Sequence, residues 1–206
     1  MVEQGGWTYS DASAAATWAR RLLWADAALS GAAIALALLR GLDPWRQGPA
    51  DMAIGIGQII VFIACAFVTL RWLYLANANA RALGATDLMG SPGLAVGWFF
   101  IPLANLFMPY VTVRDMWKAS ADPRDWQAAS ASGAIVLWWV LWLAGNIAGT
   151  ISLRLWLEYP KEAGDAGEIF SLVSNLASIP AALILAWIIG NIQAMQEHAR
   201  LKVALA

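Results

Sequence analysis

Residues 97–110 read GWFFIPLANLFMPY, an aromatic and apolar stretch that contains two prolines and an asparagine. The stretch lies in an apolar segment, 93–113, which is long enough to be counted as a membrane span. At helical spacing Pro102, Asn105 and Pro109 would lie on one stripe. Each proline removes an N–H group and frees a carbonyl one turn earlier, and in lipid such groups need protein or water as partners. The segment is therefore expected to be buried among other helices or to be re-entrant.

The composition around this stretch is that of a polytopic membrane protein. The 206 residues are 60% hydrophobic and 13% charged, with a mean hydropathy of +0.59. Soluble domains are nearer 45–50% apolar and about 25% charged. The net charge of -1 gives no general reason to bind nucleic acid. A lone cysteine, Cys65, excludes a disulfide framework and a thiolate metal cluster.

The apolar runs on both sides of this stretch predict an all-α bundle of four transmembrane helices. The expected spans are about 18–40, 53–80, 132–157 and 168–196, with a re-entrant or interfacial segment at 93–119. Together they form a single transmembrane domain, 18–206, after a polar tail, 1–17. The tail contains no Lys or Arg, which is unlike a cleavable signal peptide, so we expect it to be retained.

The distribution of basic residues separates four spans from five. If segment 93–113 crosses, six basic residues lie on the inner side and seven on the outer side, which is no bias. If it does not cross, nine lie inside and four outside. The four outer residues are Arg40, Arg46, Arg154 and Lys161. The four-span alternative is favoured, and it places both termini in the cytoplasm and an acidic loop outside.

A long motif extends from Trp72 to Ser120. Its elements include Ser91-Pro92-Gly93, Gly97-Trp98-Phe99-Phe100-Ile101-Pro102, Ala104-Asn105-Leu106, Pro109-Tyr110 and Asp115-x-Trp117. This block resembles the bacterial membrane family known as domain of unknown function 4328, whereas the flanking helices match it only in hydrophobic pattern. The family usually has Glu at the place of Asp115. The resemblance implies an integral protein of the bacterial inner membrane, and it implies no activity.

Asp26 is the only charge well inside a predicted span. An intramembrane acid is a candidate proton or cation site. In the four-span arrangement, however, Arg71 is expected at a similar depth, and an Asp26–Arg71 ion pair would neutralise both groups. The structural ion pair is favoured over a transport site.

The interrupted segment has two interpretations. Broken helices line the substrate sites of transporters, because their freed backbone groups coordinate ligands. The favoured alternative is a wedge under the bundle in which Asn105 caps the freed carbonyls. A helix over residues 111–119, which contains Asp115 and Trp117, would then lie at the headgroup level.

A polar stripe on the last span is a third candidate. Ser171, Ser174, Asn175 and Ser178 follow i, i+3, i+4 and i+7 spacing. Such a stripe can line a pore in an oligomer, but it more often forms hydrogen bonds between helices. Asn146 in the preceding span is the expected partner.

No arrangement of residues points to catalysis. The sequence has no zinc-protease, nucleophile-elbow or phosphate-loop motif, and His198 is the only histidine, so no enzyme activity, cofactor or metal is expected. The leading hypothesis is an accessory or assembly subunit of a membrane complex, or a homo-oligomeric scaffold, that contacts lipids and other membrane helices and no nucleic acid. The alternative is a small channel or transporter that uses the break around Asn105, the Ser171–Ser178 stripe and Asp26.

Overall fold

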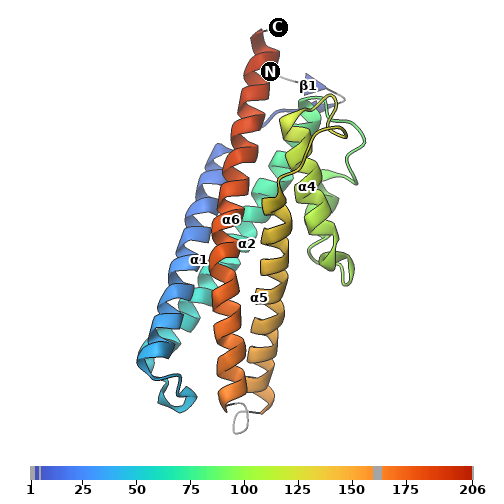
Figure 1. Cartoon of the computed structure of the whole chain (residues 1–206). Helices are drawn as coiled ribbons and strands as arrows, with labels where there is room; N and C mark the ends of the chain where they lie inside the picture. The colour runs from blue at the N-terminus through green and yellow to red at the C-terminus, as the bar shows by residue number, and fades with distance from the viewer. Residues whose placement is uncertain (1–2, 5, 160–163, 206) are drawn as a thin grey trace. The chain divides into compact units, whose positions relative to one another are not determined.

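The computed structural model describes residues 3–4, 6–159 and 164–205, and it is an all-α fold (Figure 1). Two short strands, β1 (Glu3–Gln4) and β2 (Trp7–Thr8), pair antiparallel before the first helix. The remaining elements are α1 (Ser13–Leu39), η1 (Pro44–Arg46), α2 (Pro49–Ala82), α3 (Pro92–Gly97), η2 (Ala104–Leu106), α4 (Met108–Ala121), α5 (Gly133–Glu158) and α6 (Gly164–Leu205). Of the outer basic residues, Lys161 lies outside the described part.

Four helices in the described part of the chain, α1, α2, α5 and α6, are long and apolar enough to cross a membrane. The prediction of an all-α bundle with four spans is therefore confirmed. The helices extend beyond several of the predicted spans: α1 begins at Ser13 rather than near residue 18, and α6 continues to Leu205 rather than ending near residue 196. Asp26 is consequently the central residue of α1.

The interrupted segment does not form one helix. Helix α3 ends at Gly97, the Leu103 backbone adopts a positive φ of 66°, and α4 begins at Met108. Pro109 stands in the first turn of α4, where its missing N–H group would have had no helical partner in any case. The expected stripe of Pro102, Asn105 and Pro109 on one helix is therefore wrong, because the helix stops and restarts between them.

The fold consists of two compact units. The first contains residues 1–21, 66–136 and 185–206, and the second contains residues 22–65 and 137–184. The prediction of one transmembrane domain stays a prediction.

The core of the first unit joins the ends of the long helices to α4. Trp72 of α2, Met116 of α4 and Ile192 of α6 are at most 1% exposed. Trp117 and Trp187 stack with ring centroids 5.4 Å apart. Burying large apolar side chains in this way stabilises the unit by about 1.5–3 kcal/mol for each one.

In the second unit, segments of α1, α2, α5 and α6 pack through small residues. Gly145 and Gly149 of α5 lie against Ser174 and Ser178 of α6, and a Cβ atom added at Gly149 would lie 2.9 Å from Ser174 Oγ. Small residues allow membrane helices to approach closely. The turn between α1 and α2 contains Asp43, which accepts a hydrogen bond from Trp45 N and so caps η1.

Candidate functional site: a polar cavity in the second unit

The second unit contains an open cavity of about 540 Å³ between its helical segments. Each of its four helical segments contributes one face, and about half of the lining residues carry polar or charged side chains. Representative lining residues are Asp26 and Ser30 from α1, Gln58 from α2, Ser152 from α5, and Ser171 and Asn175 from α6. Binding sites for small molecules commonly have volumes of about 300–1,000 Å³. This cavity therefore has the size of a small-molecule site.

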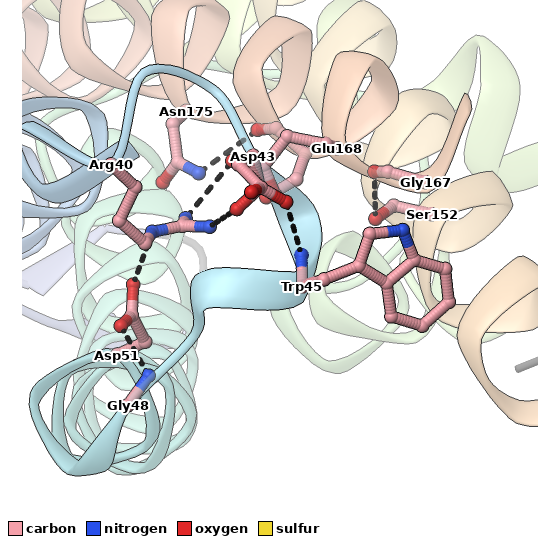
Figure 2. A network of polar contacts seen from close by, with 10 residues as sticks. Arg40, Asp43, Trp45, Gly48, Asp51, Ser152, Gly167, Glu168 and Asn175 are labelled. Atoms are coloured by element: carbon pink, nitrogen blue, oxygen red, sulfur yellow. Dashed lines mark hydrogen bonds and ion pairs between the residues drawn. The ribbon is translucent and has the colours of Figure 1, made fainter. Parts of the chain in front are cut away.

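One end of the cavity is a charged cluster around Arg40 (Figure 2). The Arg40 guanidinium lies 3.1 Å from Asp51 Oδ1 and 3.0 Å from Glu168 Oε1, and it also donates to the Asp43 carbonyl at 2.9 Å. The side chains of Arg40, Asp51 and Glu168 are 13%, 19% and 7% exposed. Charged groups this buried need ionic partners, because desolvation of an unpaired charge is costly. The cluster therefore fixes the α1–α2 turn to the beginning of α6.

Aromatic packing holds the same end together. The Trp45 and Trp156 rings meet edge to face with centroids 6.3 Å apart, and both lie close to glycines at the beginning of α6. A Cβ atom at Gly167 would lie 2.8 Å from Trp156 Nε1. The Ser152 hydroxyl donates a hydrogen bond to the Gly167 carbonyl at 2.8 Å. Gly167 belongs to the first turn of α6. This end is thus closely packed as well as charged (Figure 2).

Amide side chains form the middle of the cavity. Gln58 Nε2 donates to Asn175 Oδ1 at 2.7 Å, and Asn175 Nδ2 donates to the Ser171 carbonyl of its own helix. Ser174 Oγ donates to the Gly145 carbonyl at 3.0 Å and so connects α6 to α5. Gln58 is seven residues from Asp51, so this layer lies about 10 Å from the charged cluster at 1.5 Å per residue.

Asp26 and Ser30 stand at the other end of the cavity. They are four residues apart on α1, so they share a helix face, and both line the cavity. Asp26 is fourteen residues from Arg40, which corresponds to about 21 Å along the helix. Neither side chain forms a hydrogen bond or an ion pair with any residue that the structure describes. The Asp26 end of the cavity therefore holds an acid that the charged cluster cannot neutralise by contact.

The residues of the predicted stripe all line this cavity. Two of the four, Ser174 and Asn175, also form hydrogen bonds between helices. Asn146 is not their partner, because its side chain donates to the Trp142 carbonyl of its own helix. The Asp26–Arg71 ion pair stays a prediction, since Asp26 belongs to the second unit and Arg71 to the first.

The family motif lies in the first unit. Pro109 is buried, and Arg114 binds Asp115 at 2.7 Å beside the Tyr110 ring. The hydrogen bond to Asp115 raises the pKa of the Arg114 guanidinium. Helix α4 buries Asp115 and Met116, so it forms part of the core of this unit rather than lying free at a surface.

Two motif residues hold buried polar atoms without partners. Trp98 Nε1 and Asn105 Oδ1 are buried, and neither has a hydrogen-bond partner among the described residues. The Asn105 side chain forms no hydrogen bond with any described group, so the predicted capping of freed carbonyls is wrong. The chain bends at Leu103, which changes which carbonyls the amide can reach.

The structure brings in several residues that the sequence did not single out: Ser30, Arg40, Asp51, Gln58 and Glu168. Gln58 is a lone amide in an apolar run, and this exception in the sequence indicates a polar contact within the span. Arg40, Asp51 and Glu168 stand at the ends of predicted spans, where charges are common. Their mutual contact required the tertiary structure.

The described part of the chain contains no cluster of three or more His, Cys, Asp or Glu side chains that could hold a metal ion. The side chains that line the cavity can form hydrogen bonds, and Asp26 adds a carboxylate.

The motif found in the sequence is matched by a comparison with known families. Residues 46–194 match the family described as Domain of unknown function (DUF4328), which is more than half of the chain and includes most of the cavity. No curated protein and no solved structure matches the chain. On this match, the protein belongs to the DUF4328 family.

Proposed function

We propose that this membrane protein is a small, non-catalytic channel or transporter that binds a polar solute in the cavity of the second unit. The supporting observation is the cavity itself: it has Asp26, Ser30, Gln58 and Asn175 in its lining, within helices that are apolar enough to span a membrane. Polar groups in such helices are costly unless they face protein or a water-filled space. Polar groups that line a space between membrane helices are what a solute pathway requires.

The test is the accessibility of the cavity from the two sides of a membrane. Ser178 is replaced by cysteine in a Cys65→Ser background, and sealed proteoliposomes are treated with 2-(trimethylammonio)ethyl methanethiosulfonate, which does not cross lipid. A pathway predicts modification of Ser178→Cys from each side in turn. The matched control is Val140→Cys on α5, whose side chain is 57% exposed on an apolar surface and should not react. The proposal is overturned if the Ser178→Cys thiol reacts from only one side of the membrane or from neither side.

A second candidate is an accessory subunit of a membrane complex or a homo-oligomeric scaffold. The apolar part of α2 supports it, since no residue of its most hydrophobic window is buried. Exposed side chains there include Ile56, Ile59, Ile60, Ile63 and Phe67. Lipid or partner helices would cover this surface. Extraction in native lipid discs, followed by the intact mass of the particle, tests this candidate: a stoichiometric foreign chain or a second copy would support it, and a monomer would contradict it.

The proposal includes a location and an orientation. The protein is assigned to the bacterial inner membrane, with both termini in the cytoplasm. The distribution of basic residues supports this orientation, because connections rich in Lys and Arg face the cytoplasm. With four spans, the connection around the interrupted segment contains five of them: Arg71, Arg81, Arg114, Lys118 and Arg124.

A further inference from the structure

We propose that the Asp26 end of the cavity binds a small organic ammonium cation, with the Asp26 carboxylate as its counter-charge and Ser30 beside it. This inference rests on the proposed function, since it requires that the cavity admit a solute. It adds the chemical class of that solute and the residue that recognises it.

The first argument is the balance of charge. The lining contains three carboxylates, Asp26, Asp51 and Glu168, and one guanidinium, Arg40. Arg40 is already bound to Asp51 and Glu168 at 3.1 and 3.0 Å. Asp26 is therefore left without an ionic partner among the lining residues. An electronegative space within low-dielectric surroundings attracts a cation and repels an anion.

The second argument is an unused polar group next to Asp26. The Ser30 side chain is only 2% exposed, lines the cavity and forms no hydrogen bond with the described residues. Its hydroxyl is therefore open to a hydrogen bond with a molecule in the cavity. A solute that carries a hydroxyl group or an N–H group would satisfy Ser30 while its positive charge meets Asp26.

The third argument favours an organic cation over a metal ion. The cavity volume of about 540 Å³ is far larger than a single ion requires, and apolar side chains, including Ile54, Leu172 and Phe62, contribute to its lining. Gly57 of α2 lies against the Leu29 side chain of α1, and the half-exposed Phe62 is five residues farther along α2, about 8 Å closer to the Asp26 end. The face of an aromatic ring attracts ammonium groups, including quaternary ones.

Arg40 does not make the cavity an anion site. Its guanidinium donates to the Asp43 carbonyl and to Glu168, and its Nε atom faces Asp51. An incoming anion would have to displace one of two acids that are themselves buried. The cation is therefore the class of ligand that the charges favour.

The experiment compares choline with its uncharged isostere 3,3-dimethyl-1-butanol, using the full chain in lipid discs. Binding is measured as ligand-dependent thermal stabilisation, which rises with the ratio of ligand concentration to Kd. We expect choline to bind at least tenfold more tightly than the isostere. Asp26→Asn should lower choline affinity at least tenfold, whereas Asp26→Glu, which keeps the charge, should retain it. The control Glu158→Gln removes an acid of the same unit that is exposed and outside the cavity, and it should change nothing.

The outcomes separate this inference from the proposed function. If choline and the isostere bind equally, or if Asp26→Asn binds choline as the unchanged protein does, the cation assignment is overturned. Preferential stabilisation by KCl over choline chloride would overturn the organic character of the ligand. The labelling of Ser178→Cys from both sides is independent of all these results, so it would still support a solute pathway.

Discussion

Gln58 of α2 donates a hydrogen bond to Asn175 of α6 at 2.7 Å, across the middle of the polar cavity. The two residues are 117 positions apart in the chain. Gln58 is an isolated amide within an apolar span, and Asn175 belongs to the polar stripe of α6. This one contact makes the polar stripe of α6 part of a network that includes a second helix.

The Gln58–Asn175 pair should contribute modestly to stability. We expect Gln58→Leu and Asn175→Leu each to lower the free energy of unfolding, with a coupling energy of about 0.6 kcal/mol and at most about 1.7 kcal/mol, the values typical of hydrogen bonds between membrane helices. A double-mutant cycle in lipid discs measures it. Asn191→Leu is the control, because Asn191 donates to the Trp187 carbonyl of its own helix and forms no hydrogen bond to another helix in the described part of the chain. A coupling energy of zero would mean that the bond does not join the helices.

Arg40 should be far more important than its neighbour Arg46. Arg40→Met leaves Asp51 and Glu168 buried without a cation, so we expect a loss of about 3–5 kcal/mol in the free energy of unfolding. Arg46 pairs with Asp43 at 3.4 Å, but its side chain is 75% exposed. Arg46→Met should therefore cost less than about 1 kcal/mol. Unfolding measured by steric trapping compares the two variants, and equal losses would contradict the importance of the buried cluster.

The glycines that line or border the cavity should differ in their tolerance of a methyl group. In Gly167→Ala the new Cβ would lie 2.8 Å from Trp156 Nε1, so the indole must move, at a cost of about 1–3 kcal/mol. In Gly55→Ala the Cβ meets nothing within 4 Å, and the change should be neutral or stabilise α2 by up to about 1 kcal/mol. Thermal unfolding of the two variants in the same detergent is the measurement. A fully tolerated Gly167→Ala would show that Trp156 is not held in place.

Tyr9 should make the first unit less stable at high pH. Burial, followed by the nearby Glu197 carboxylate, raises the pKa of Tyr9 to about 12 from its usual 10. The unfolded chain therefore releases this proton at a lower pH than the folded chain does. The contribution to stability is present below pH 10 and is lost as the pH rises from 10 to about 12. We expect Tyr9→Phe to weaken this pH dependence, measured by unfolding at pH 9 and pH 11.5. An unchanged difference between the two pH values would show that Tyr9 does not titrate as described.

The four-span topology predicts that the α4–α5 and α5–α6 connections lie on opposite sides of the membrane. Cysteines at Ser130 and at Glu158, in a Cys65→Ser background, provide the test, since both positions are exposed. Ser130→Cys should react with an impermeant maleimide only from the cytoplasm, and Glu158→Cys only from outside. Ser120 is a poor reporter, because it is 1% exposed and accepts a hydrogen bond from Gln196. Labelling of Ser130→Cys from outside would restore five spans.

The broken segment separates what could be predicted from what could not. Two prolines and an asparagine were enough to predict that residues 93–113 would not form an ordinary span, and the chain does break there. The direction of the chain after the break was not predictable, since it depends on the positive φ of Leu103 and on the packing of Met116 and Trp117 in the first unit. A capping role for Asn105 requires a carbonyl freed by proline within reach of its amide, and the end of α3 at Gly97 and the start of α4 at Met108 change that geometry.

The sequence by itself determined the all-α class, the four spans and the membership in the family, because hydropathy and motif spacing are sums over neighbouring residues. It also marked Asp26 and the Ser171–Ser178 stripe as polar exceptions within apolar runs. Only the tertiary structure decided that they share one cavity, that Arg40 meets Asp51 and Glu168, and that Ser30 lies beside Asp26 without a partner. The physical reason is that the rotation and register of each helix are set by packing against other helices, as in the contact between Gln58 and Asn175, and local patterns contain no information about that rotation.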